Sequence, residues 1–360
     1  MQRRTFVSGL FVLLFPIFST FPVVSIIEHP HALTVKTEYG DYYVNEPVLI
    51  ELIKSKGMQR LKLIHQYGIT QYSRPGDWFN RFDHSVGVFV ILRKFGARLD
   101  EQIAGLMHDV SHTVFSHVGD FVFDTYFNRY SYQDDKHEWC LEQLGITAIL
   151  KKYGYQHCCT PEAKKRQRMF ENDRPDICAD RIEYLIRGGL VDKLMTQDEV
   201  MPILDSLYFE NGTWIFTDQK QARKLADMGL LLSEDIFGSA WNGVIYTHAA
   251  NALKHALETG LITQDEIHFS TDDLIWERML RQGDAFIQES LEKVIHSEKY
   301  YTISDKTDYD VHLRAKCLTI DPWVEIPDGI ARLSSIDAEY AAEYKRINDF
   351  QINGWYIKLH

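Results

Sequence analysis

The 360-residue chain has few cysteines, and their spacing does not suggest a common structural role. There are five of them, an odd number, and none shows CxxC spacing. This argues against a disulfide framework and against a zinc knuckle, and it favours reduced, mostly buried thiols. The adjacent pair Cys158–Cys159 is interpreted as structural, and the remaining three are Cys140, Cys178 and Cys317.

Positive charge is also in short supply. Lys and Arg number 39 against 51 Asp and Glu, so the formal net charge is −12. A protein that grips nucleic acid over a whole face needs many cations to contact the phosphates. We therefore expect no extended nucleic-acid surface, although a local basic pocket for one nucleotide is compatible with this composition. The basic run KKRQR at 164–168 is interpreted as a solvated loop in preference to an effector patch.

Charge of either sign is absent from residues 5–27, which follow the basic start MQRR. A basic segment before an apolar segment is typical of a secretory signal, and this run is also long enough for a membrane anchor. The alternative is a mis-assigned start, with the natural chain beginning near Ile26. If residues 1–25 are a true leader, we expect an exported or membrane-anchored protein. Otherwise we expect a cytoplasmic one.

Beyond the leader, the apolar residues recur with helical periodicity. Helices are expected at 47–68, 81–99, 99–123, 136–145, 176–190, 218–260 and 272–296. Asp100 is the predicted N-cap of its helix, and Gly188–Gly189 is the predicted stop of another.

Strand signals are short and lie between or beyond the helices. Hairpins are expected at 31–45, around Gly40–Asp41, and at 207–217, where Asn211–Gly212 is a typical two-residue turn. Shorter strands are expected at 300–304 and 311–320, and loops at 68–80 and 151–175. The pattern predicts an all-α fold with small peripheral β-hairpins.

Residues 104–117, AGLMHDVSHTVFSH, place three histidines and an aspartate in a segment otherwise apolar enough to be buried. Burying such groups without compensation is strongly unfavourable, and a metal ion is the simplest compensation. His108 and His112 share one helix face. The neighbours His108 and Asp109 can both bind a metal only if the helix distorts or ends there. With His84 and Asp180, two more polar residues in apolar segments, they make a donor set suited to Fe, Mn, Zn or a similar divalent ion.

The order of these residues resembles a known superfamily. His84, His108–Asp109 and Asp180 follow the H…HD…D pattern of the HD-domain metal-dependent phosphohydrolases. Several segments resemble the branch that contains the dNTP triphosphohydrolases, both bacterial dGTPases and SAM-and-HD-domain enzymes. They are MQRLKLIHQYG (58–68), NRFDHSVGV (80–88), AGLMHDVSHTVFSHVGD (104–120), KHE (136–138) and DICADRIEYLIRGG (176–189).

The resemblance implies a mainly helical HD-domain fold. Residues 45–190 would form the catalytic core, and residues 191–360 would be a helical extension with short β elements, packed on that core. The branch is commonly oligomeric, which implies a homo-oligomer. The divalent transition metal would be Fe, Mn or Zn, with Mg²⁺ accompanying the nucleotide.

The resemblance also implies residue roles. The metal ligands would be His84, His108, Asp109 and Asp180. The catalytic residues would be His112, His117, Asp120 and His137, with His117 as general acid to the leaving 5′-oxygen. Substrate contacts would come from Arg81 to phosphate, from Arg181 and Tyr184 to phosphate and sugar, and from Gln66 near the sugar 3′ position.

The chain departs from the branch at four positions. Gly188 stands where the branch usually has an Asp that reads the sugar 3′-hydroxyl, and Tyr67 replaces a Leu near the sugar edge. Ser111 and Val114 replace a Gly and a Pro that shape the pocket wall.

The expected activity is hydrolysis of (deoxy)nucleoside triphosphates to nucleoside and triphosphate. Two alternatives stay open: a nucleotidase or phosphodiesterase acting on another phosphate ester, and a nucleotide-sensing HD protein without turnover.

Overall fold

The computed structural model describes residues 24–76, 79–123, 132–313 and 318–360. The leader predicted at 1–25 lies almost wholly outside the described residues. Within them, no helix combines the length and the apolar character needed to cross a bilayer. Cys140, Cys158, Cys159 and Cys178 are free thiols, and three of these four are buried, as predicted. Cys317 is outside the described residues.

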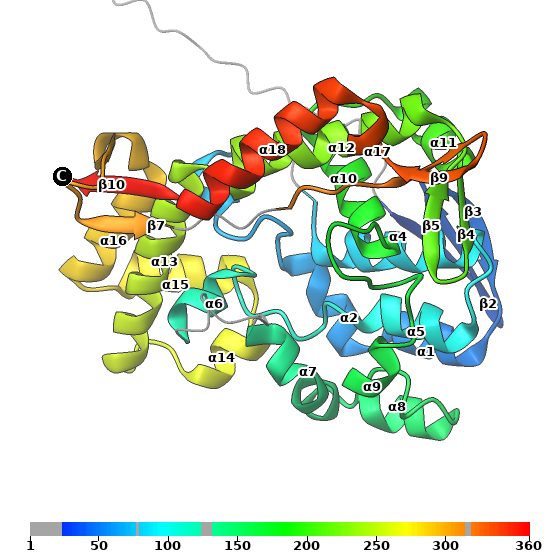
Figure 1. Cartoon of the computed structure of the whole chain (residues 1–360). Helices are drawn as coiled ribbons and strands as arrows, with labels where there is room; N and C mark the ends of the chain where they lie inside the picture. Colours follow the sequence, from blue (N-terminus) through cyan, green and yellow to red (C-terminus); the bar gives the residue numbers. More distant parts are fainter. Residues whose placement is uncertain (1–23, 77–78, 124–131, 314–317) are drawn as a thin grey trace, which may run out of the picture.

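The described chain begins with a three-stranded antiparallel sheet at one side of the molecule (Figure 1). Its strands are β1 (Ser25–His29), β2 (Ala32–Thr37) and β3 (Gly40–Val44), in that spatial order. The predicted hairpin is present, but its turn is formed by Glu38 and Tyr39, because Thr37 pairs with Gly40. β1 was not predicted.

The helix α4 (Arg81–Lys94) lies at the centre of the first half of the molecule. It is buried along its length from Arg81 to Leu92, and it packs against α5 and α10. A helix that is buried on all sides belongs in the middle of a core. The helices of this half are α1 (Pro47–Lys54), α2 (Lys56–Arg60), η1 (Leu61–Leu63), α3 (Thr70–Ser73), α4, α5 (Leu99–Met107), α6 (Val118–Val122), α7 (Tyr132–Gln143), α8 (Ile146–Lys152), α9 (Pro161–Lys164) and α10 (Ala179–Val191).

Several predicted boundaries in this half were wrong. The helix expected at 99–123 is interrupted, because α5 ends at Met107 and α6 begins only at Val118. Arg98, not Asp100, is the N-cap of α5, and Asp100 lies in its first turn. α10 continues through Gly188–Gly189 to Val191, since both glycines pack tightly inside the molecule.

Short helices also interrupt the predicted loops and divide one predicted helix. α3 lies inside the loop expected at 68–80, and α9 lies inside the loop expected at 151–175. The helix expected at 47–68 is divided at Ser55, whose side chain accepts a hydrogen bond from the Met58 backbone N–H and caps α2.

The second half adds further helices and two more sheets (Figure 1). The helices are α11 (Gln197–Asp205), α12 (Gln219–Leu232), the π-helical turn η2 (Ser233–Phe237), α13 (Ala240–Glu258), α14 (Gln264–Phe269), α15 (Asp272–Gln282), α16 (Ala285–Ile295), η3 (Ser297–Lys299), α17 (Leu333–Ile336) and α18 (Ala338–Asn353). The strands are β4 (Leu207–Glu210), β5 (Thr213–Phe216), β6 (Tyr301–Ser304), β7 (Val311–Leu313), β8 (Trp323–Ile326), β9 (Gly329–Arg332) and β10 (Trp355–Leu359).

The β4–β5 hairpin confirms the predicted Asn211–Gly212 turn, in which both residues have positive φ. β5 pairs in parallel with β8, so the hairpin becomes part of a sheet with order β4-β5-β8-β9. The sheet β6-β10-β7 lies at the opposite end of the molecule. The predicted strand at 311–320 is described only in part, because 314–317 lie outside the described residues.

One contiguous hydrophobic core runs from Leu33 in β2 to Ile347 in α18. It includes residues of both halves, so the two halves pack against each other through apolar side chains. The mainly helical architecture with small peripheral sheets is as predicted. The division at residue 190 stays a prediction.

Candidate metal centre

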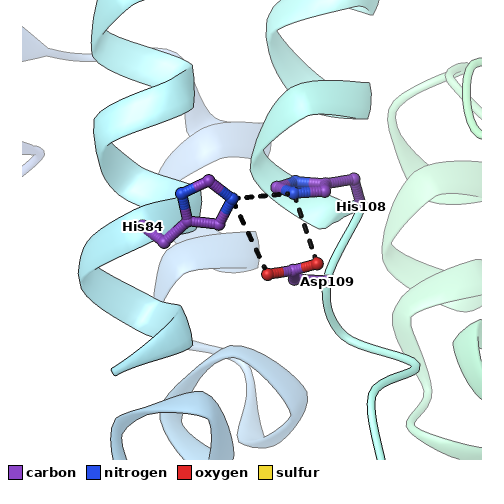
Figure 2. A group of neighbouring side chains, drawn as sticks. All are labelled: His84, His108 and Asp109. Atoms are coloured by element: carbon purple, nitrogen blue, oxygen red, sulfur yellow. Dashed lines mark hydrogen bonds and ion pairs between the residues drawn. The ribbon is translucent and has the colours of Figure 1, made fainter. Parts of the chain in front are cut away.

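Three helices bring four candidate ligands to one point in the interior. His84 projects from α4, His108 is the C-cap of α5, and Asp109 follows it directly. Asp180 lies in the first turn of α10. Because α5 ends at Met107, the adjacent His108 and Asp109 both face His84, as Figure 2 shows. The structure therefore confirms one of the two conditions set by the sequence, a helix that ends at the His-Asp pair.

The ligand atoms lie within a few ångströms of one another. Nε2 of His84 is 3.2 Å from Nε2 of His108 and 3.0 Å from Oδ1 of Asp180. Asp109 is close to both rings, with Oδ1 3.3 Å from Nε2 of His108 and Oδ2 3.8 Å from Nε2 of His84. Two imidazoles and two carboxylates in one buried cluster are a donor set for a divalent transition metal.

The other ring nitrogens show that this cluster fits a cation. Nδ1 of His108 lies 2.7 Å from the Gly105 carbonyl oxygen, and Nδ1 of His84 contacts the carboxylate of Glu183. Both partners accept hydrogen bonds, so each Nδ1 holds a proton and each Nε2 is the ring nitrogen directed at the centre. Two ring nitrogens and two carboxylates directed at one buried point need a positive charge among them, which either ring protons or a metal ion can supply. The residues present therefore fit a divalent metal.

The electrostatics of the cluster also favour a positive charge at its centre. Burial disfavours a charge on His84, but the carboxylates of Glu183 and Asp180 outweigh it and raise the pKa of His84 to about 10. Burial would also raise the pKa of Asp109, yet the charges of Arg81 and His108 hold it well below its usual range. The carboxylates thus remain ionised, and the centre attracts positive charge.

Arg81 positions Asp109. Its side chain is 2% exposed, its Nη1 donates to Oδ2 of Asp109 at 2.6 Å, and its Nε donates to Oγ of Ser116 at 2.7 Å. Its Nη2 donates to the Gln66 carbonyl oxygen at 3.3 Å. The structure therefore places Arg81 behind a metal ligand, and the phosphate contact expected of it stays a prediction.

Two of the predicted catalytic residues contact the ligands or their immediate neighbours. His112 donates from Nε2 to Oδ1 of Asp109, 3.1 Å away, and burial lowers its pKa well below its usual range. His137 lies with Nδ1 3.0 Å from Oγ of Ser111, and burial lowers its pKa to about 4. Both rings are therefore neutral near pH 7.

His117 and Asp120 form a pair next to His112. Nδ1 of His117 is 3.2 Å from Oδ2 of Asp120, and the rings of His112 and His117 are 4.9 Å apart in an edge-to-face arrangement. Oδ1 of Asp120 accepts a hydrogen bond of 2.7 Å from the backbone N–H of Tyr132. A small pocket is lined by these four residues together with Thr113, Ser116, Gly119 and Gln133.

The predicted substrate residues are placed less uniformly. Arg181 donates from Nη1 to the carbonyl oxygens of Asn172 and Asp176, at 2.6 and 3.0 Å, and so holds the segment before α10. In contrast, Oε1 of Gln66 and the hydroxyl of Tyr184 are buried without a hydrogen-bond partner among the described residues. The last two are thus the ones available to a polar ligand.

Four residues that contribute to the centre were not identified from the sequence. Glu183 is fully buried and contacts Nδ1 of His84, and Arg187, Glu38 and Tyr39 contact Glu183 or each other. The signal was present in DRIEYLIR, where Glu183 and Arg187 lie one turn apart on a helix with an apolar face. Gly87 on α4 makes room for Glu183, because a Cβ at Gly87 would lie 2.3 Å from Glu183 Oε1.

Tyr67 and Gly188 occupy neighbouring space. A Cβ on Gly188 would lie 2.6 Å from the Tyr67 hydroxyl, which donates to Oδ2 of Asp192 at 3.3 Å. Tyr67 is 2% exposed and packs edge-on against Phe79 and Phe237. The two departures from the family pattern at 67 and 188 are therefore complementary.

Comparisons with known proteins agree with this geometry. The HD domain family model matches residues 81–138. The chain is 32% identical over 327 residues to the uncharacterized protein YdhJ of Bacillus subtilis, which covers 89% of this chain and 97% of that protein. It is 29% identical over 292 residues to the metal-dependent phosphohydrolase cns2 of Cordyceps militaris, covering 79% of this chain and 83% of the relative.

Two further similarities are more limited. The deoxynucleoside triphosphate triphosphohydrolase SAMHD1 of Bos taurus is 37% identical over 89 residues, 21% of this chain and 15% of that enzyme. A solved phosphohydrolase from Bacteroides thetaiotaomicron has the same fold, with a TM-score of 0.66 at 15% identity over 93% of this chain and 99% of that chain.

The donor set and the relatives together define the class of this protein as a metal-dependent phosphohydrolase. The chain belongs to the HD-domain metal-dependent phosphohydrolase superfamily. HD domains bind a divalent metal, and His84, His108 and Asp109 each offer a ligand atom, with all three atoms within 4.8 Å of one another.

Proposed function

We propose that this phosphohydrolase cleaves the ester bond between a nucleoside and its triphosphate, releasing the nucleoside and intact triphosphate. The observation that carries the proposal is the close approach of the His117–Asp120 pair to the metal centre. His112 links them, since it hydrogen-bonds Asp109 on one side and packs against His117 on the other. A general acid next to a metal centre can protonate the leaving oxygen while the metal activates water, which accelerates phosphoester hydrolysis.

A divalent transition metal, for which Fe, Mn and Zn are candidates, would lower the pKa of a water molecule and act as a Lewis acid toward phosphate, with Mg²⁺ accompanying the nucleotide. His84, His108, Asp109 and Asp180 would hold it, and Arg81 and Glu183 would orient Asp109 and His84.

His117 would protonate the leaving 5′-oxygen. Its Nδ1 faces Oδ2 of Asp120, so the carboxylate fixes the ring and favours a proton on Nδ1. Nε2 is then the atom that holds and releases the transferred proton. Asp120 is itself fixed by the backbone N–H of Tyr132.

Unpartnered buried polar atoms support a polar substrate. Oε1 of Gln66, Nδ1 of His112 and the hydroxyl of Tyr184 have no hydrogen-bond partner within the described part of the chain. Each such group costs about 1–3 kcal/mol when left unsatisfied. A nucleotide hydroxyl or a water molecule would donate to Oε1 of Gln66 and Nδ1 of His112, and a phosphate oxygen would accept from the Tyr184 hydroxyl.

A second candidate is hydrolysis of a different phosphate ester, by a nucleotidase or phosphodiesterase. It is favoured by the Tyr67–Gly188 arrangement, because position 188 offers no side chain for a sugar hydroxyl and Tyr67 fills the adjacent space. The coverage of the relatives is consistent with it. The phosphohydrolase cns2 aligns over 79% of this chain, whereas the bovine triphosphohydrolase aligns over 21%.

Product analysis tests the proposal. The purified full-length protein is incubated with each dNTP, each NTP and bis(4-nitrophenyl) phosphate, in Mn²⁺ or Fe²⁺ with Mg²⁺, and the products are separated by ion-exchange chromatography. Nucleoside with intact triphosphate supports the proposal. Orthophosphate or diester cleavage transfers the assignment to the second candidate. Nucleotide binding without turnover by the metal-loaded protein indicates a nucleotide sensor.

Two variants serve as controls. His108→Ala with Asp109→Ala removes two ligands and is the blank for metal-dependent turnover. His117→Ala leaves every ligand in place, and we expect it to retain metal while kcat falls about 10²–10⁴-fold, the usual contribution of a general acid. An unchanged kcat in His117→Ala would remove the acid from this mechanism.

A further inference from the structure

The turn of the N-terminal hairpin is buried, which is unusual because turns normally lie at the surface. Glu38 is 5% exposed and Tyr39 is 1% exposed, although Tyr43 on the following strand is 62% exposed. The turn is fixed locally, since the Thr37 hydroxyl accepts from the Tyr39 N–H at 3.1 Å and donates to the Gly40 carbonyl oxygen at 3.0 Å. The hairpin thus inserts two polar side chains into the core.

Both side chains reach the residues that support His84. The Tyr39 hydroxyl donates to Oε1 of Glu183 at 3.0 Å, and Oε2 of Glu183 contacts Nδ1 of His84. Oε1 of Glu38 lies 2.9 Å from Nη2 of Arg187, whose Nε donates to Oε1 of Glu183 at 2.5 Å. A continuous path of hydrogen bonds and ion pairs therefore runs from the hairpin turn to a metal ligand.

The charges along this path do not cancel. Two carboxylates, Glu38 and Glu183, share one guanidinium, Arg187, and all three side chains are at most 4% exposed. Burial raises the pKa of Glu38, and with Glu38 ionised the trio carries one net negative charge next to the ring of His84. Without Glu38, the whole charge of Arg187 would be available to neutralise Glu183. A second buried carboxylate on one cation is poor evidence for a stabilising role, but it raises the basicity of the imidazole that faces the metal.

We propose that Glu38 and Tyr39 are positioning residues of the metal centre, and that the hairpin turn sets the affinity of His84 for the divalent ion. Tyr39 fixes the orientation of the Glu183 carboxylate, and Glu38 keeps part of the Arg187 charge away from it. Both residues precede the segment matched by the HD domain model, which begins at residue 81.

Metal binding tests the proposal directly. The protein is stripped with a chelator, and Mn²⁺ is titrated into it by isothermal calorimetry. Tyr39→Phe and Glu38→Gln are each expected to raise the Kd for Mn²⁺ about 10-fold, the lower end of the effect of losing a direct partner of a ligand, because both residues act on His84 through Glu183. Tyr43→Phe and Glu28→Gln, at exposed positions of the same sheet, are expected to leave the Kd unchanged. Kd values of Tyr39→Phe and Glu38→Gln within twofold of the parent would overturn the proposal.

A purely structural role is separated by two further measurements. Urea unfolding of the stripped protein reports any general loss of stability, which by itself does not change the Kd of molecules that remain folded. Glu38→Asp restores the charge and is expected to bind Mn²⁺ more tightly than Glu38→Gln, whereas equal Kd values would refute the charge argument. Tyr39→Phe keeps the ring and decides the matter if Glu38→Gln does not fold. The readout is metal binding, so it is independent of which ester is cleaved.

Discussion

Tyr67 and Gly188 pack in a complementary way, because the large side chain of one occupies the space that a side chain of the other would need. The hydroxyl of Tyr67 lies where a side chain at 188 would begin, and Leu232 closes the remaining space, with its Cδ1 2.9 Å from the Cβ position. Gly188→Ala is expected to destabilise the protein by about 1–3 kcal/mol, the usual effect of overpacking. Urea unfolding would measure it.

The matching test is a double substitution. Tyr67→Leu with Gly188→Ala should cost less than the sum of the two single changes, by at least about 0.5 kcal/mol, because the residues are in contact. Gly229→Ala is the control, since a Cβ there meets atoms no closer than 3.6 Å. Additive effects at 67 and 188 would contradict the shared-volume interpretation.

His248 on α13 predicts a pH dependence of stability. It is 7% exposed, and its Nε2 has no hydrogen-bond partner within the described chain. Burial lowers the pKa of His248 to about 4, below the unfolded value of 6.5. The unfolded chain therefore takes up the proton first, and the stability from this residue is full above pH 6.5 and lost as pH falls toward 4. Between pH 7 and pH 5 the loss is about 2 kcal/mol.

Urea unfolding at pH 7 and at pH 5 measures this loss. His248→Leu should reduce the difference between the two pH values by most of that amount. His157→Leu, at an exposed position, controls for the removal of a histidine. If His248→Leu shows the same difference as the parent, His248 is not the group responsible.

At the scale of single residues, the metal ligands could be predicted from the sequence, but most of the residues that position them could not. His84, His108, Asp109 and Asp180 could be predicted because isolated polar residues in apolar segments follow a known order. Glu183 was passed over because its partner His84 is 99 positions away, and its spacing from Arg187 is also that of an ordinary ion pair on a helix surface.

Among the elements, the turn between α5 and α6 depends on the C-terminal half of the molecule. Phe115 and Ser116 both have a φ of 55°, a conformation that needs support from outside the turn. Asp272, at the start of α15, accepts from the Phe115 N–H at 2.7 Å and from the His65 N–H at 2.8 Å. The Val114 N–H donates to the Ile267 carbonyl oxygen at 2.9 Å.

Asp272→Ala tests this dependence. It would leave two buried backbone N–H groups unsatisfied, and we expect a loss of about 2–5 kcal/mol in urea unfolding. Because the same turn carries His117 and Ser116, and Ser116 holds Arg81 against Asp109, kcat should also fall and the Kd for Mn²⁺ should rise. Asp265→Ala, at an exposed position of α14, is the control. Unchanged stability in Asp272→Ala would show that the turn holds its shape without α15.

The elements themselves illustrate which boundaries a sequence can reveal. The Asn211–Gly212 turn was predictable because the backbone requires positive φ there. The end of α5 carries no proline or glycine at residues 107–111. The single indication that the helix ends there was that His108 and Asp109 must both face one metal ion. Gly188–Gly189 was misread as a stop, since the same residue type also serves close packing inside a helix.

For the whole molecule, metal removal is the informative perturbation. The ligands lie on three helices whose positions in the chain range from 84 to 180, so a bound ion ties together segments that are distant in sequence. A ligand at 100 times its Kd stabilises the folded state by about 2.7 kcal/mol. Thermal unfolding should therefore shift upward by several degrees as Mn²⁺ is added to stripped protein. His108→Ala with Asp109→Ala should abolish the shift, and a shift that persists in this variant would place the stabilising ion elsewhere.

The burial of the turn at Glu38 and Tyr39 and the anchoring by Asp272 have a consequence for how relatives are recognised. The parts that hold this centre in shape are drawn from nearly two-thirds of the chain, whereas the segment that carries its most recognisable residues is short. Proteins that resemble one another only in that short segment share the metal ligands. The residues that position those ligands can differ from one protein to the next. Divergence in metal preference and substrate within the superfamily can therefore arise in regions that a local alignment never compares.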